Sequence, residues 1–81
     1  MRLDKFLKVS RIIKRRTVAN EACDAGRVLV GGKPVRASYE VKPGDVLEIT
    51  LGGKPFRAEV LEVAEHVTKE GASALYRVLD A

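Results

Sequence analysis

The sequence has 81 residues, of which 46% are hydrophobic and 32% charged. This length fits one small globular domain, and this composition excludes a wholly disordered protein. It has no run of about 18–20 apolar residues that would span a membrane, and its lone cysteine excludes a disulfide framework within the chain. The net charge is +4 at pH 7. Together with the absence of a recognisable targeting segment, these features predict a cytoplasmic protein.

The N-terminal segment is predicted to form a basic amphipathic helix. Residues 1–16 hold seven lysines and arginines and one acid, whereas residues 17–81 hold eight basic and ten acidic side chains. One side of a helical wheel carries Leu3, Phe6, Leu7, Ser10 and Ile13, and the other carries Lys5, Lys8, Arg11 and Arg15. Lys14 would fall on the apolar side, so the helix is expected to end or bend near Ile13. A basic face of this kind is typical of polyanion binding.

A second helix is predicted to follow. Thr17 is the expected N-cap, because its hydroxyl can accept a hydrogen bond from a free backbone N–H. Val18, Ala22 and Ala25 have the spacing of a buried stripe, and Gly26 is expected to end the helix with a positive φ.

The apolar period then changes from that of a helix to that of strands. Strands are predicted over residues 27–30, 33–35, 46–51, 56–63 and 75–79, separated by glycine-containing turns. The apolar phase slips between Val60 and Leu61, which predicts a bulge or twist. Residues 65–74 are expected to form a loop or one short helical turn. The fold class is therefore α+β, with two packed N-terminal helices followed by a small, mostly antiparallel, curled sheet in a single domain.

Several residues match the pattern of a known module. They are Arg2, Leu3, Asp4, Leu7, Arg16, Thr17, Ala19, Gly26, Val28, Val30, Gly32, Ser38, Gly44 and Asp45. This pattern resembles the S4 RNA-binding domain, also called the alpha-L RNA-binding motif, over about residues 1–51, with 52–81 as a β extension. Residues 2–17 are most similar to stand-alone bacterial proteins of the RqcP (YabO) type. The chain departs from related families at Gly31, where asparagine is frequent, and at Ala37, where proline is frequent.

The resemblance implies a non-catalytic factor in ribosome-associated quality control. Its expected partners are large-subunit ribosomal RNA, the tRNA of a stalled peptidyl-tRNA, and a protein that adds alanine tails to nascent chains. Two alternatives stay open: a heat-shock-type factor that recycles released large subunits, and a protein-interaction adaptor with incidental RNA contact. The chain is expected to be a monomer, and a membrane-surface role is disfavoured because the apolar stripe is needed for the core.

Phosphate binding favours arginine, whose planar fork can bond two oxygens at once. The expected RNA-binding residues of the N-terminal segment are Arg2, Lys5, Lys8, Arg11, Lys14, Arg15 and Arg16. Arg16 is also expected to reach Asp4, which would orient the arginine rather than contact RNA. Largely on the strength of the resemblance, Lys33 and Arg36 are expected to form the other wall of the RNA groove, with Arg27 at its floor.

No set of residues predicts catalysis, a metal or a cofactor. His66 lies far in sequence from Cys23, and neither belongs to a zinc-binding or nucleophile–base pattern. The C-terminal third is acidic and is expected to face away from RNA or to contact a protein. Its acidic residues are Glu59, Glu62, Glu65, Glu70 and Asp80. The sequence also has only two tyrosines, two phenylalanines and no tryptophan, which is too few for rows of stacked bases.

Overall fold

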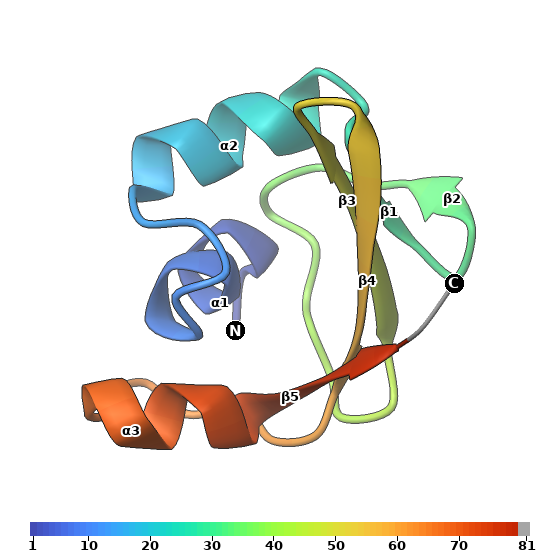
Figure 1. Ribbon diagram of the computed structural model, residues 1–81. Coiled ribbons are helices and arrows are strands. Elements are labelled where there is room, and N and C mark those ends of the chain that lie inside the picture. Colours follow the sequence, from blue (N-terminus) through green and yellow to red (C-terminus); the bar gives the residue numbers. More distant parts are fainter. Residues whose placement is uncertain (80–81) are drawn as a thin grey trace.

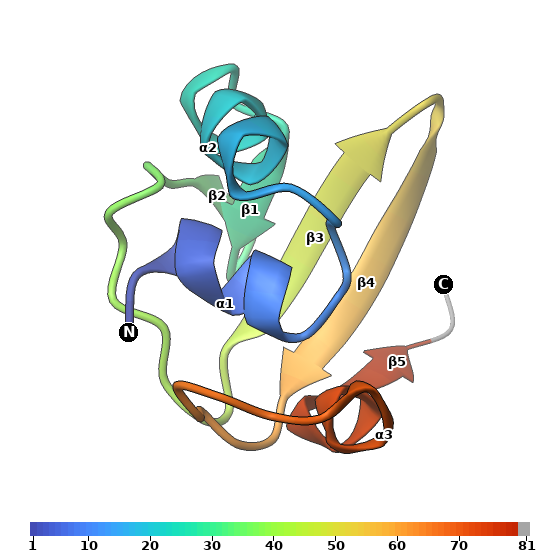
Figure 2. The same ribbon diagram turned by 90° about the vertical axis from the view of Figure 1, so that its left-hand side faces the viewer.

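The computed structural model describes residues 1–79, without the side chains of Leu51 and Lys54; Asp80 lies outside the described residues. Helices α1 (Leu3–Val9) and α2 (Arg16–Asp24) pack against one side of an antiparallel sheet, and a short helix, α3 (Lys69–Ala72), lies on the far side of α1 from α2 (Figures 1 and 2). The strands are β1 (Val28–Val30), β2 (Lys33–Pro34), β3 (Val46–Leu51), β4 (Lys54–Val60) and β5 (Tyr76–Leu79). Their order in the sheet is β2-β1-β3-β4-β5. The predicted α+β class is confirmed.

Two-residue glycine turns set the register of both hairpins. Gly31 and Gly32 join β1 to β2, and Gly52 and Gly53 join β3 to β4, with φ between 60° and 99° at all four residues. Positive φ at both central positions is the type I′ requirement, which matches the right-handed twist of the flanking strands. β4 therefore begins at Lys54, two residues before the predicted start.

The slip in apolar phase after Val60 lies at the end of β4, where the N–H groups of Leu61 and Glu62 both donate to the Leu75 carbonyl, so that two residues oppose one as in the predicted bulge. These bonds lie outside the ladder between β4 and β5, and the Leu61 side chain is exposed. The predicted helical turn in residues 65–74 is present as α3, which is followed by a 3₁₀ turn over Ser73–Leu75. None of the helices in the described residues is long and apolar enough to cross a membrane.

The predicted buried face of the first segment is confirmed, although its helix is shorter than predicted. Leu3, Phe6, Leu7, Ser10 and Ile13 are all buried. The helix ends at Val9, and the chain turns back at Arg11, whose φ of 64° lies in the left-handed region. This conformation costs an L-residue about 1–2 kcal/mol. The turn returns Ile13 to the core, where its N–H donates to the Leu7 carbonyl.

Two predictions for the second helix are wrong. The N-cap is Arg15 rather than Thr17, and no side chain bonds to the first free N–H groups. The buried face consists of Ala19, Ala22 and Cys23 rather than Val18, Ala22 and Ala25. The rotation follows from Asn20, whose amide donates to Asp4 of α1 and so turns the neighbouring small side chains toward α1. The predicted helix end is confirmed, with φ of 77° at Gly26.

Val18→Ala tests this rotation of α2, with Val28→Ala in the neighbouring strand β1 as the reference for a buried valine. Val28→Ala removes a fully buried side chain and should lower the free energy of unfolding by about 2–3 kcal/mol. Val18→Ala changes a side chain that is 40% exposed. It should shift the free energy of unfolding by less than about 0.5 kcal/mol, because alanine also favours the helix. Urea denaturation measures both values, and equal losses would contradict the observed helix orientation.

Candidate nucleic-acid interface

A buried carboxylate organises the basic residues at the start of α1. The Asp4 side chain is only 3% exposed. Its two oxygens accept hydrogen bonds from Arg2 Nε at 3.2 Å and Asn20 Nδ2 at 3.2 Å, and Arg16 Nε lies 3.4 Å away. The backbone N–H of Lys5 donates at 2.8 Å. We call Arg2, Asp4, Arg16 and Asn20 the Asp4 cluster; the contact expected between Asp4 and Arg16 is present.

The Asp4 cluster presents positive charge outward. Burial disfavours the charged carboxylate, but hydrogen bonds from Asn20, Arg16 and Arg2 outweigh it, so the pKa of Asp4 is lowered. The carboxylate is therefore ionised at neutral pH and holds two guanidinium groups, which leaves a net charge of +1. Both arginine side chains stay about half exposed, at 50% and 45%. Each guanidinium has five N–H donors, so each retains donors for a phosphate.

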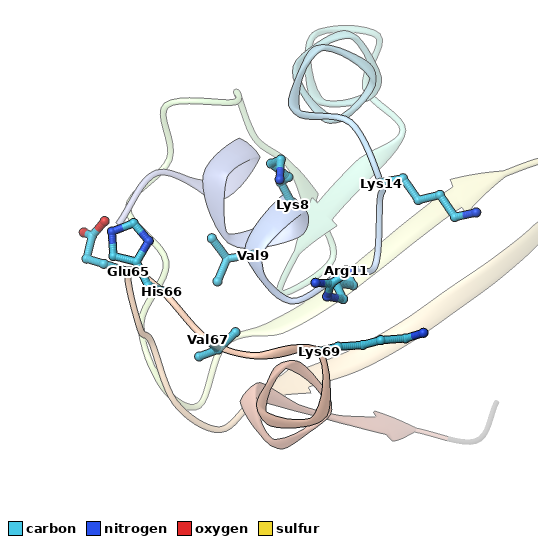
Figure 3. A pocket seen from close by; sticks show the side chains of 8 residues that line it. All are labelled: Lys8, Val9, Arg11, Lys14, Glu65, His66, Val67 and Lys69. Atoms are coloured by element: carbon cyan, nitrogen blue, oxygen red, sulfur yellow. The ribbon is translucent and has the colours of Figure 1, made fainter.

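A second basic feature lies at the other end of α1. An open groove of about 630 Å³ runs between the end of α1 with its following loop and the segment that leads into α3 (Figure 3). We call this the basic groove; its lining residues are Lys8, Val9, Arg11, Lys14, Glu65, His66, Val67 and Lys69. In Figure 3 the two valines lie in the middle, with Glu65 and His66 at one end.

The acid in the basic groove is already paired. Glu65 accepts from the ammonium of Lys5, and this hydrogen bond and charge lower the pKa of Glu65. Lys5 is thus bound to the C-terminal part of the chain as well as lying on α1. By contrast, the cationic side chains that line the groove make no ion pair with the acids among residues 1–79. These unpaired side chains are Lys8, Arg11, Lys14 and Lys69.

The remaining predicted residues lie at other places. Arg15 is exposed at the start of α2, and Lys33 is exposed on the edge strand β2. Arg36 lines a hollow of about 420 Å³ that also includes Cys23. Arg27 lines a different hollow, of about 250 Å³, on the outer side of α2. Arg27 and Arg36 therefore share no hollow, and their contact with RNA stays a prediction.

Three polar residues of these surfaces were missed from the sequence. Asn20 completes the Asp4 cluster, and His66 and Lys69 line the basic groove. Thr68 was an unused signal in the sequence, since threonine is a common N-cap residue and its hydroxyl does cap α3 by accepting from the Gly71 N–H at 3.1 Å. That signal fixes where the helix begins. It says nothing of the proximity of Lys69 to the loop after α1.

Cys23 does not have the properties of a nucleophile. Burial, together with the negative charges of Asp4 and Asp24, raises the pKa of its thiol to about 11. The side chain therefore stays a protonated thiol at neutral pH and packs in the core. No group of three or more histidine, cysteine and acidic residues within the described part of the chain is placed to hold a metal ion.

Comparison with known proteins identifies the family. The model of the S4 domain matches residues 1–47, which is more than half of the chain. The chain belongs to the S4 domain family. The match spans both helices and the strands up to the start of β3, so it contains the whole Asp4 cluster and the α1 side of the basic groove.

Relatives in the S4 family match nearly the full chain. The RQC P-site tRNA stabilizing factor of Halalkalibacterium halodurans is 55% identical over 96% of this chain and 89% of that protein. The protein of the same name from Bacillus subtilis is 49% identical over 98% and 92%. The trimeric structure of Heat Shock Protein 15 from Vibrio cholerae matches with a TM-score of 0.90 at 25% identity, over 98% of this chain and 81% of that one. The predicted relationship to stand-alone S4 proteins of the RqcP type is confirmed.

Asp4→Asn tests the role of the buried carboxylate. The amide keeps the shape but loses the charge that holds two arginines, so the free energy of unfolding at pH 7 should fall by about 1–3 kcal/mol. Because the folded-state pKa of Asp4 is lowered, its contribution is present at neutral pH and is lost as the pH falls below about 4. The variant should therefore lose less stability on acidification than the wild type.

The matched control is Asp24→Asn, which changes an exposed carboxylate at the end of α2. It should shift stability by less than about 0.5 kcal/mol and leave the acid transition nearly unchanged. Urea denaturation between pH 3 and pH 7 measures both quantities. Identical pH profiles for the wild type and Asp4→Asn would contradict a stabilising ionised carboxylate.

Proposed function

We propose that this protein binds large-subunit ribosomal RNA and tRNA, and stabilises peptidyl-tRNA on stalled large subunits during ribosome-associated quality control. The observation that carries the proposal is the 55% identity, over 96% of the chain, to a protein named RQC P-site tRNA stabilizing factor. Membership of the S4 family and the concentration of basic side chains around α1 support it. The protein acts without catalysis, while a partner adds alanine to the nascent chain.

The mechanism is preferential binding. A factor that binds one state of the ribosomal complex more tightly than the others raises the population of that state. In the Asp4 cluster, a buried carboxylate holds Arg2 and Arg16 in fixed positions, so little side-chain entropy is lost when they meet phosphates. Contacts of this kind release counterions from RNA, so affinity falls steeply with salt.

The proposed RNA-binding residues are those predicted from the sequence: Arg2, Lys5, Lys8, Arg11, Lys14, Arg15, Arg16, Arg27, Lys33 and Arg36. The proposal treats residues 1–81 as one cytoplasmic domain, with a motif core at about 1–51 and a β extension. It also treats the protein as a monomer. The related structure from Vibrio cholerae was solved as a trimer, so analytical ultracentrifugation of this protein alone is the direct test of that last point.

Arginine substitutions test the RNA contact. Arg2→Ala and Arg16→Ala should each abolish co-sedimentation with large ribosomal subunits at physiological salt, because each removes a guanidinium positioned for phosphate. Lys42→Ala is the control. Lys42 is an exposed cation in the turn that leads into β3, and it lies outside both basic surfaces. Circular dichroism checks that all variants are folded. Undiminished co-sedimentation of both arginine variants would contradict the proposal.

A recycling factor of the heat-shock type is the second candidate, favoured by the TM-score of 0.90 to Heat Shock Protein 15. The two functions differ in the ribosomal state that is bound. Alanine content of nascent chains on stalled subunits should fall when the protein is removed if it stabilises peptidyl-tRNA, and stay unchanged if it only recycles subunits. Pull-downs before and after nuclease treatment separate both from a protein-interaction adaptor, whose partners would survive the nuclease.

A further inference from the structure

The basic groove draws its cations from segments that are far apart in the sequence. Lys8 lies on α1, Arg11 and Lys14 lie in the loop after it, and Lys69 begins α3 in the C-terminal extension. Figure 3 shows Arg11, Lys14 and Lys69 toward the same end of the groove, away from Glu65. The S4 family match ends at residue 47, so Lys69 lies outside the part of the chain that the family pattern covers.

Clustering of these cations is electrostatically unfavourable in the free protein. Like charges at short range repel each other, and no acid among residues 1–79 pairs with any of the four side chains. The carboxylate of Glu65 is held by Lys5, so its charge is already offset. Another cation of the extension does pair with an acid, since Arg77 lies 2.5 Å from Glu59. At the end of the groove away from Glu65, the positive charge of Arg11, Lys14 and Lys69 is therefore not balanced by an ion pair with an acid of the described chain.

The backbone at Arg11 supports a role for its side chain. A φ of 64° is readily adopted by glycine and is strained for other residues. Arginine at this position places an exposed guanidinium at the groove, at a cost in backbone conformation. A left-handed residue directly after the C-cap is a common way to end a helix, so the turn accounts for the φ, and the use of arginine in place of glycine concerns its side chain.

We propose that the C-terminal extension takes part in RNA binding, with Lys69 joining Lys8, Arg11 and Lys14 to hold one stretch of phosphodiester backbone. This inference rests on the proposed function and adds a second contact surface to the Asp4 cluster. The groove is open, and its lining includes no phenylalanine, tyrosine or tryptophan, so it offers phosphate contacts rather than a row of stacking rings. Lys8, which lies on α1 as Asp4 does, extends the positive charge from the Asp4 cluster toward the groove.

On this proposal, part of the C-terminal third contacts RNA, whereas the sequence predicts that this acidic third faces away from RNA or contacts a protein. The extension is acidic overall, but one of its acids binds Lys5 and its Lys69 faces the groove. Leu75 belongs to the buried core and Val67 packs against it, so apolar packing holds the extension in place, and the exposed Lys5–Glu65 pair adds a contact to α1. Net charge of a segment does not decide which of its side chains face the ligand.

The test measures binding at several salt concentrations to deproteinised large-subunit ribosomal RNA and to purified large subunits. Lys69→Gln should lower affinity at 0.1 M salt by about five- to tenfold and reduce the slope of log affinity against log salt by roughly 0.7–0.9, as expected for one lost phosphate contact. Arg11→Gly should lose affinity similarly, while its melting temperature is unchanged or raised because glycine accepts the positive φ. Lys42→Gln, the matched control, should keep the wild-type slope.

The outcomes separate this inference from the proposed function. If Lys69→Gln and Arg11→Gly bind like Lys42→Gln while Arg16→Ala does not bind, the groove is not an RNA contact and the proposed function stands. If the groove variants bind deproteinised RNA normally but lose binding to intact subunits, the groove contacts a ribosomal protein, and the inference is overturned. If the wild type binds neither ligand, the proposed function fails together with it.

Discussion

The interaction on which the rest of the structure depends is the burial of the Asp4 carboxylate between the two helices. Its oxygens hold Arg2, Arg16 and Asn20, which come from both helical segments. Burying a carboxylate is costly unless it is fully hydrogen-bonded, and these partners meet that requirement. The same contacts fix the rotation of α2 and the direction of two guanidinium groups. Fold and charge presentation are therefore properties of one cluster.

The second consequence of the helix packing is the shape of the loop between α1 and α2. Ile13 must reach the core, and the chain does this by turning at Arg11 after a helix of only seven residues. The turn leaves Arg11 and Lys14 exposed on the outside while the apolar residue goes in. The C-terminal segment lies alongside because Val67 and Leu75 pack on the same core, and Lys5 binds Glu65 at its surface. The basic groove is the space between these two segments.

Local patterns predicted those parts of the structure that depend on neighbours in the chain. The glycine pairs identified both hairpins because only such residues readily accept positive φ at two successive positions. The apolar spacing identified the buried side of the first segment, even though the helix ends early. The rotation of α2 was predicted wrongly because it depends on the bond from Asn20 to Asp4, sixteen residues away. Lys69 was missed because its position depends on the packing of Val67 and Leu75 against a core whose other members, such as Phe6, lie far away in the sequence.

The two basic surfaces differ in a way that bears on recognition. The arginines of the Asp4 cluster are anchored by a buried group, so their geometry is set before a ligand arrives and favours particular phosphate positions. The groove cations are mostly lysines with no partner among the described residues, so they supply positive potential that many backbone conformations can satisfy. A factor that must hold a folded RNA in one place needs anchored arginines like those of the Asp4 cluster to set the position of the RNA. It needs unpaired cations like those of the groove to bind RNA whose local shape varies. Helix α1 joins the Asp4 cluster and the basic groove because it carries residues of both surfaces.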